Sequence, residues 1–189
     1  MRHLIATVVM ILTSSALAQT TKPAAAKDAP GNDEYVVTKM RVQDFAPRKY
    51  FFITIETSYA EMATSIPPAV ERLMASVKEN NVSVKGPMLF VYHGAGMDAQ
   101  KKFTVDLGFP VEDSTKDAGE GKVRQLEPFH AACVIYSGAV ENIAQAYQQV
   151  FTDLFAAGLK PTEETREYYL YWESPESRNN VQLIQVGVK

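Results

Sequence analysis

A repeat within the chain constrains its fold more than any single motif does. The segment VQDFAPRKYFFITIETSYAEM from Val42 aligns with VRQLEPFHAACVIYSGAVENI from Val123 at an offset of about 81 residues. A shorter loop then changes the offset to about 79, so that Phe90 falls on Tyr169. The other matched positions are Phe45 with Leu126, Pro47 with Pro128, Ile53 with Val134, Met62 with Ile143, and Tyr92 with Tyr171.

This repeat predicts one structural unit that is used twice, over about 36–111 and 122–189. Two copies of one unit tend to pack around a pseudo-twofold axis, and we expect a groove where they meet. The sequence therefore predicts where a ligand would bind better than it predicts the ligand itself.

The first residues are typical of a secretory signal peptide. A short basic start precedes an apolar run from Leu4 to Leu12, and Ala16-Leu17-Ala18 is an A-x-A cleavage site. The alternative is a membrane anchor, but the apolar run has about nine residues where a spanning helix needs about 20. We therefore expect residues 1–18 to be removed, the protein to be exported to the periplasm or the medium, and no membrane insertion afterwards.

Residues 19–33 are rich in Ala, Pro, Lys and Asp and show no apolar periodicity, which predicts a flexible linker. The folded domain is then expected over 34–189. Within it, the polar, Gly-containing segment 113–122 joins the two repeats.

Charge and cysteine content limit the partners of the domain. The full chain has a formal net charge of −3, and loss of Arg2 with the leader makes it one unit more negative. Since no basic run is present, nucleic acid and anionic lipid are disfavoured as partners. The single cysteine, Cys133, lies in an apolar strand; we expect a buried, inert thiol, with a reactive thiol as the alternative.

Each repeat shows the pattern β-α-β-β. Strands are expected at 50–57, 87–93 and 103–111 in the first repeat, and at 123–136, 166–173 and 181–188 in the second. The first helix should begin near Ile66, because Pro67 and Pro68 fit only near a helix start. The predicted fold is α+β: one antiparallel sheet with two helices on one face and a central ligand groove.

The second repeat resembles the GyrI-like domains, also called AraC-type effector-binding domains, which are close to the SOUL haem-binding fold. The matching residues are Gly138, Glu141 and Tyr147 around the helix, Glu167 and Tyr169 in a Glu-x-Tyr strand, and Ile184, Val186 and Val188 in the closing strand. Val140 stands where the family has a tyrosine. Because the chain shows no helix-turn-helix segment, the resemblance implies small-molecule binding and not gene regulation.

Glu167 is the main candidate for a ligand-binding residue. By strand alternation, Glu167, Tyr169 and Tyr171 point the same way, and the resemblance places the glutamate in the groove. The first repeat would add Met88, Phe90 and Tyr92 from the opposite side. A solvated Glu167 beside Arg166 and plain core packing of the other residues are the alternatives. A carboxylate among aromatic rings favours a hydrophobic, cationic organic ligand, since each ring adds about 0.5–2 kcal/mol of cation–π attraction.

Other chemistry is less well supported by the sequence. Some GyrI-like proteins are hydrolases that use a Trp and a Glu, so a hydrolase with Glu167 or Glu173 as base is an alternative to pure binding. His93 and His130 stand alone, so no metal site and no cofactor are predicted, although haem binding through either histidine is an alternative that the SOUL likeness implies. We expect a protein that sequesters or senses its ligand; an interaction module with a protein partner remains a further alternative.

Overall fold

The computed structural model describes residues 34–96 and 98–189. The predicted signal peptide (1–18) and linker (19–33) lie outside the described residues. The strands are β1 (Tyr35–Val37), β2 (Arg41–Phe45), β3 (Arg48–Thr57), β4 (Leu89–His93), β5 (Phe103–Pro110), β6 (Lys122–Leu126), β7 (Phe129–Gly138), β8 (Pro161–Tyr171) and β9 (Val181–Val188). The helices are α1 (Met62–Glu79), α2 (Ile143–Ala156) and the 3-10 turn η2 (Val140–Asn142).

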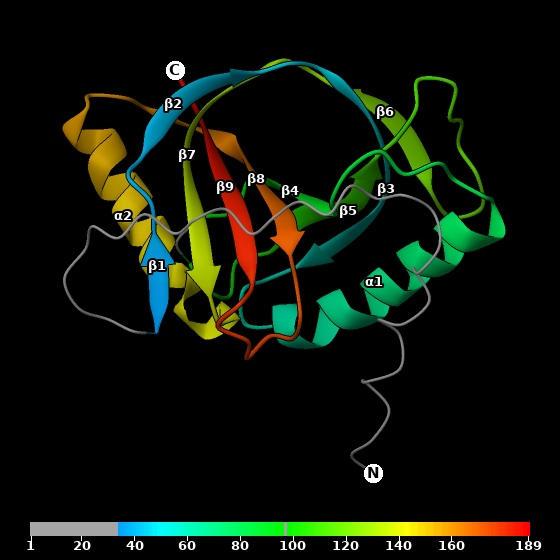
Figure 1. The fold of residues 1–189 in the computed structure, drawn as a ribbon, viewed down its shortest axis with the longest axis horizontal. Coiled ribbons are helices and arrows are strands. Elements are labelled where there is room, and N and C mark those ends of the chain that lie inside the picture. The colour runs from blue at the N-terminus through cyan, green and yellow to red at the C-terminus, as the bar shows by residue number, and fades with distance from the viewer. Residues whose placement is uncertain (1–33, 97) are drawn as a thin grey trace, which may run out of the picture.

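These strands form one curled antiparallel sheet (Figure 1). Its order is β1-β7-β9-β8-β4-β5-β3-β6, and β2 also pairs with β7. Only two residues separate β2 from β3, and in Figure 1 the two strands form one long arch over the curled sheet, so that β2 pairs with β7 at one end and β3 pairs with β6 at the other. The predicted α+β class, with one antiparallel sheet and two helices, is confirmed.

The two halves have the same order of elements and the same pairings. In each half a strand, a helix and two strands follow one another, as β3-α1-β4-β5 and as β7-α2-β8-β9, and β4 meets β8 in the middle of the sheet. Val42 pairs with Ala132 and Val123 pairs with Phe51, which agrees with the predicted alignment of Val42 on Val123. A common origin of the two halves stays a prediction.

The strand register differs from the predicted alignment in the middle strands. Phe90 of β4 pairs with Leu107, and the corresponding residue of β8, paired with Ile184, is Glu167. The pairings therefore place Phe90 opposite Glu167, and Tyr92 corresponds to Tyr169 where the sequence suggested Tyr171. A shift of two residues leaves every side chain on its face, so the apolar pattern cannot detect it.

Helix α1 begins earlier than the sequence indicated. It starts at Met62 and holds Pro67 and Pro68 inside it, whereas we expected a start near Ile66. Pro67 and Pro68 are the sixth and seventh residues of this helix, so each removes one intrahelical hydrogen bond to the first turn. Packing of the apolar stripe against the sheet, with Ala69 and Leu73 fully buried, stabilises the turn that precedes them.

Both helices cover the same face of the sheet. One row of paired residues crosses the sheet on this face, in the order Ile53, Leu107, Phe90, Glu167, Ile184 and Val134. The first three belong to the core under α1 (the α1-side core, with Leu73 and Val105), and the last two belong to the core under α2 (the α2-side core, with Val150 and Leu154). Glu167 is thus a carboxylate at the boundary between two apolar cores.

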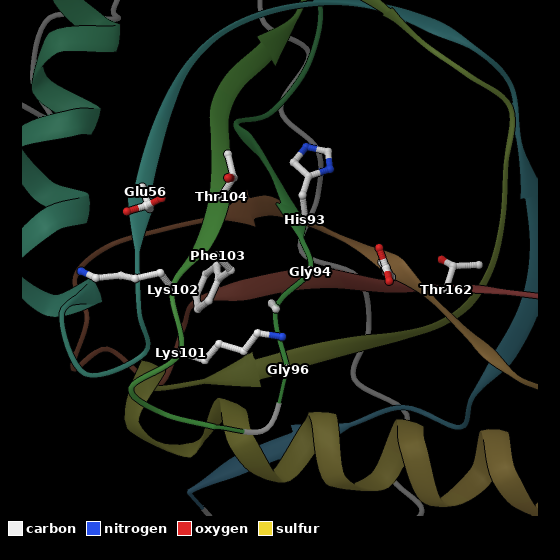
Figure 2. Close-up of a pocket in the computed structure, with 11 residues that line it drawn as sticks. Glu56, His93, Gly94, Gly96, Lys101, Lys102, Phe103, Thr104 and Thr162 are labelled. Atoms are coloured by element: carbon white, nitrogen blue, oxygen red, sulfur yellow. The ribbon is translucent and has the colours of Figure 1, made fainter.

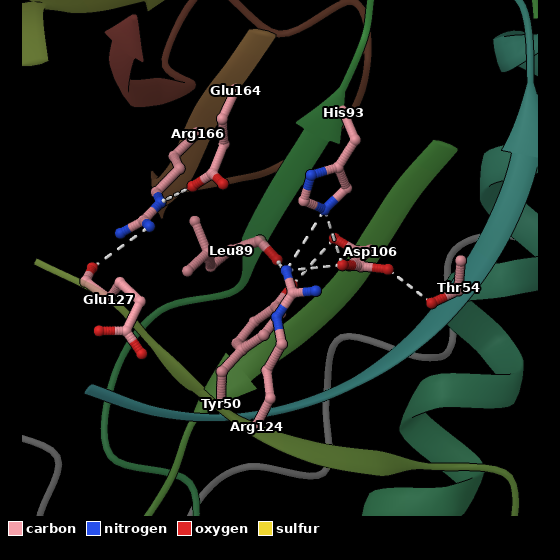
Figure 3. A network of polar contacts seen from close by, with 9 residues as sticks. All are labelled: Tyr50, Thr54, Leu89, His93, Asp106, Arg124, Glu127, Glu164 and Arg166. Carbon is pink, nitrogen blue, oxygen red and sulfur yellow. Dashed lines mark hydrogen bonds and ion pairs between the residues drawn. The ribbon is translucent and has the colours of Figure 1, made fainter. Parts of the chain in front are cut away.

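The opposite face of the sheet carries a third, smaller core and a polar network. The core contains Tyr50, Phe52, Leu89, Val91, Leu126 and Tyr168. In the network, shown in Figure 3, the buried carboxylate of Asp106 lies among Thr54, His93 and Arg124.

None of the helices in the described residues is long and apolar enough to cross a lipid bilayer.

Candidate functional site

The Glu167 carboxylate is enclosed by phenol groups from three elements. Its residue is only 4% exposed. Tyr92 of β4 donates to Oε2 at 2.9 Å, and Tyr169 of β8 donates to the same oxygen at 3.0 Å. Tyr147 of α2 donates to Oε1. The pairing of β4 with β8 positions Tyr92 and Tyr169 beside the carboxylate, and the packing of α2 on the sheet positions Tyr147.

The electrostatics of this cluster follow from burial. Burial raises the pKa of Glu167 above its ordinary value, although the three phenol hydrogen bonds act in the opposite direction. Burial, and next the nearby carboxylate, raise the phenol pKa values of Tyr92, Tyr147 and Tyr169, so these groups stay protonated donors. Within the described part of the chain, no lysine, arginine or histidine forms an ion pair with Glu167.

Asp106 is a second buried carboxylate, and its partners differ from those of Glu167. Thr54 Oγ1 donates to Oδ1 at 2.5 Å, and the Arg124 guanidinium lies 2.7 Å from Oδ2 (Figure 3). Burial alone would raise the pKa of Asp106, but hydrogen bonds from His93 and Thr54, together with the Arg124 charge, lower it overall. Asp106 therefore has its counter-charge within the protein, whereas Glu167 has only neutral donors.

A chain of aromatic rings connects Glu167 with the surface at two ends. On one side the Phe90 and Tyr169 ring centroids are 4.6 Å apart, and Trp172 meets Tyr169 edge-on at 5.5 Å. On the other side Tyr92 approaches Phe103, whose ring centroid lies 4.8 Å from that of the tilted Tyr59 ring. Tyr59 is 46% exposed and Trp172 is 39% exposed, so both ends of the chain reach solvent.

The structure brings most of the predicted site residues together. Glu167, Tyr169, Phe90 and Tyr92 form the cluster described above. Met88 packs against the α1-side core, and its carbonyl accepts the Tyr169 N–H at 2.9 Å.

Tyr171 lies outside the cluster. It is 52% exposed, and its hydroxyl donates to Glu173 Oε1 at 2.9 Å. The pairing of β8 with β9 shifts register between Tyr169 and Tyr171, which breaks the alternation on which the prediction for Tyr171 rested.

Sequence reasoning missed one site residue, Tyr147 of α2, which packs against the α2-side core and also donates to Glu167. Tyr147 belongs to the apolar stripe of α2, and that stripe predicts core packing. Its position in the stripe gave no sign that its hydroxyl reaches a carboxylate on β8. The resemblance to the GyrI-like helix was the available signal, since Tyr147 is one of the residues that carry it.

An open cleft of about 530 Å³ lies elsewhere, at the ends of β4 and β5 (Figure 2). It is lined by Glu56, His93, Lys101, Lys102, Thr104 and Thr162 among others. Lys102 pairs with Glu61, and His93 Nε2 lies 2.9 Å from Asp106 Oδ2. The cleft is wide and its charges are mixed, whereas the Glu167 cluster concentrates one buried charge among aromatic rings; we therefore take the cluster as the candidate site.

The described residues contain no group of three or more His, Cys, Asp and Glu side chains that could hold a metal ion. His130 forms an exposed pair with Asp44, 2.7 Å apart.

Comparison with known proteins places most of the folded region in one family. A family model described as the GyrI-like small molecule binding domain matches residues 38–189. A search of curated proteins found no match to this chain.

Several solved structures share the fold at low sequence identity. The crystal structure of the EcmrR C-terminal domain is 18% identical, with a TM-score of 0.66, and the match covers 80% of this chain and 97% of that one. In the cryo-EM structure of EcmrR with DNA, the match (19% identical, TM-score 0.65) covers 82% of this chain but only 57% of EcmrR.

Two further structures with this fold carry functional information, one through a bound ligand and one through its name. SAV2435 was solved with bound tetraphenylphosphonium (14% identical, TM-score 0.59, 80% of this chain and 94% of that one). A Listeria innocua protein named as a hydrolase is 11% identical, with a TM-score of 0.59 and coverage of 80% and 92%. At these identities the likeness shows the fold alone.

Proposed function

This chain belongs to the family of GyrI-like small-molecule binding domains, and we propose that it binds a hydrophobic organic cation against Glu167. One observation carries this proposal: Glu167 is a buried carboxylate with three neutral donors and, within the described residues, no cationic partner. A ligand cation would supply the missing counter-charge, as Arg124 does for Asp106.

The surroundings of Glu167 favour a hydrophobic cation over a small hydrated one. Removing a carboxylate from water is costly unless a charge is paired with it, and a poorly hydrated organic cation loses little hydration on entry. Tyr92 and Tyr169 meet the carboxylate with their hydroxyl groups, and Phe90 packs against both of their rings. An aromatic ring whose face a cation can reach adds about 0.5–2 kcal/mol to the attraction. The phosphonium bound by SAV2435 is a ligand of this kind.

Access to the carboxylate requires that side chains move. In the unliganded structure Glu167 is enclosed, while the exposed rings of Tyr59 and Trp172 lie at the two ends of the aromatic chain. Rotation of these rings would open a path without disturbing the strands. The role that follows is sequestering or sensing of the cation, because both carboxylate oxygens of Glu167 already accept hydrogen bonds from phenols.

We also propose that the protein works outside the cytoplasm. The basic start, the apolar run and the Ala16-Leu17-Ala18 site support this location. Expression of the full chain with N-terminal sequencing of the exported protein tests it: the mature chain should begin at Gln19, and an intact Met1 retained inside the cell would refute export.

Binding of tetraphenylphosphonium, measured by titration calorimetry, tests the main proposal. The wild type should bind this cation and should show no binding of triphenylphosphine oxide, which is neutral and similarly shaped. Glu167→Gln should weaken cation binding on the order of 10- to 100-fold, because the shape is kept and the charge is lost. Glu173→Gln, which removes an exposed carboxylate near the end of β8, is the matched control and should bind as the wild type does. Equal affinity of Glu167→Gln and wild type would remove Glu167 from the site.

A further inference from the structure

Gln182 of β9 is a buried amide without a hydrogen-bond partner. Its residue is 0% exposed, and within the described structure neither Nε2 nor Oε1 meets a donor or an acceptor. Leaving a buried donor or acceptor unsatisfied costs about 1–3 kcal/mol. A leucine would fill similar space without this cost, so the position calls for a partner that the protein itself does not supply.

The strand pairings place Gln182 on the ligand side of the sheet. It pairs with Tyr169 of β8 on one side and with Tyr136 of β7 on the other, and directly paired residues share a face. Tyr136 packs in the α2-side core, so this face is the one that the helices cover. In Figure 1, β9 lies between β7 and β8.

Gln182 is also a near neighbour of Glu167. Glu167 pairs with Ile184, two residues along β9, so Gln182 is its diagonal neighbour, at about 7–8 Å between backbones. The amide and the carboxylate side chains each extend from the sheet toward the helices. Diagonal neighbours on one face of a sheet are close enough for a single ligand to contact both side chains.

We propose that Gln182 is a specificity-determining residue, which hydrogen-bonds a neutral donor–acceptor group on the same ligand whose cation meets Glu167. The inference rests on the proposed function. An amide offers two N–H donors and one carbonyl acceptor, and a ligand carboxamide can satisfy both ends at once. The ligand class is therefore an aromatic cation that carries a carboxamide or a comparable pair of donor and acceptor close to its charge.

A second orphaned amide supplies an internal control. Gln185 is 1% exposed and equally without partners. It pairs with Cys133 and Arg166, and its odd spacing from Gln182 places it on the opposite face of the sheet. Replacing Gln185 thus removes the same chemistry from the same strand without touching the Glu167 side.

The test compares two pyridinium cations that differ in one substituent: 1-methylnicotinamide, which bears a carboxamide, and 1,3-dimethylpyridinium, which bears a methyl group. Wild type should prefer the carboxamide by about five- to tenfold, the contribution of one or two net hydrogen bonds. Gln182→Leu should bind both cations equally, at the wild-type affinity for 1,3-dimethylpyridinium. Gln185→Leu should keep the wild-type preference.

The outcomes separate this inference from the proposal beneath it. The inference is overturned, and the cation site stands, if wild type binds both pyridiniums equally or binds neither while still binding tetraphenylphosphonium. The same holds if the Gln182→Leu variant prefers the carboxamide as wild type does. If wild type binds no cation at all, both fall together. Gln182→Met is the second variant should Gln182→Leu fold poorly. In both variants the unliganded protein should melt at or above the wild-type temperature, because an unsatisfied amide has been removed.

Discussion

At the scale of single residues, Glu167 and its proton determine when the site can accept a cation. Burial raises the pKa of Glu167, so this carboxyl takes up a proton at a higher pH than an ordinary glutamate does. Protonation leaves the three phenols without a charged acceptor and leaves a ligand cation without a counter-charge. Cation binding and proton binding at Glu167 therefore compete.

This competition predicts a pH dependence of affinity. Above the raised pKa, the affinity for tetraphenylphosphonium should be independent of pH. Below it, the cation must displace a proton, and the affinity should fall by about tenfold for each pH unit. Calorimetry in two buffers of different ionisation enthalpy should detect proton release at the lower pH only. Glu167→Gln should show a flat profile; a flat profile in wild type would exclude Glu167 as the counter-charge.

The sign of the effect on folding is the opposite of that for a salt-bridged carboxylate. Because the folded pKa of Glu167 lies above the unfolded one, this group stabilises the folded state most at low pH, and that contribution is lost as pH rises through the folded pKa. Unliganded Glu167→Gln should accordingly gain stability relative to wild type as pH increases. Unfolding by urea at several pH values measures how the stability difference between the two proteins changes with pH. This dependence on pH should disappear in saturating ligand.

At the scale of elements, the sequence allowed the type and order of most strands and helices to be predicted, but not all of their pairings. The alternation in β5 is a strong local pattern, and this strand forms where expected. The assignment of β2 to β7 and of β6 to β3 depends on contacts between distant segments, which no local pattern encodes. The same limit explains the two-residue error in aligning Phe90.

The candidate site was predicted in part for a similar reason. Glu167 and Tyr169 were placed by strand alternation together with the family resemblance, and Phe90 and Tyr92 were placed by the internal repeat. Tyr171 was misplaced because a register shift interrupts β8, and a bulge has no clear sequence signal here. The orphaned amide of Gln182 became visible only when the burial and hydrogen bonds of β9 were known.

At the scale of the whole molecule, the sheet separates two polar centres that have different roles. The helix-covered face holds Glu167 between two apolar cores, and the opposite face holds Asp106 with its own arginine. The second arrangement is complete as it stands and holds β3, β4, β5 and β6 together through contacts of Thr54, His93 and Arg124. The first is complete only when a cation arrives, which is why we assign binding to the middle of the sheet and not to the open cleft beside His93.

A crystal structure of the protein grown with tetraphenylphosphonium tests this assignment most directly. We predict that the phosphonium lies beside the Glu167 carboxylate between α1 and α2, in contact with Tyr92, Tyr147 and Tyr169, with the rings of Tyr59 or Trp172 turned away from their unliganded positions. A phosphonium bound instead in the cleft lined by Glu56, His93 and Thr104, with the Glu167 cluster unchanged, would contradict the account.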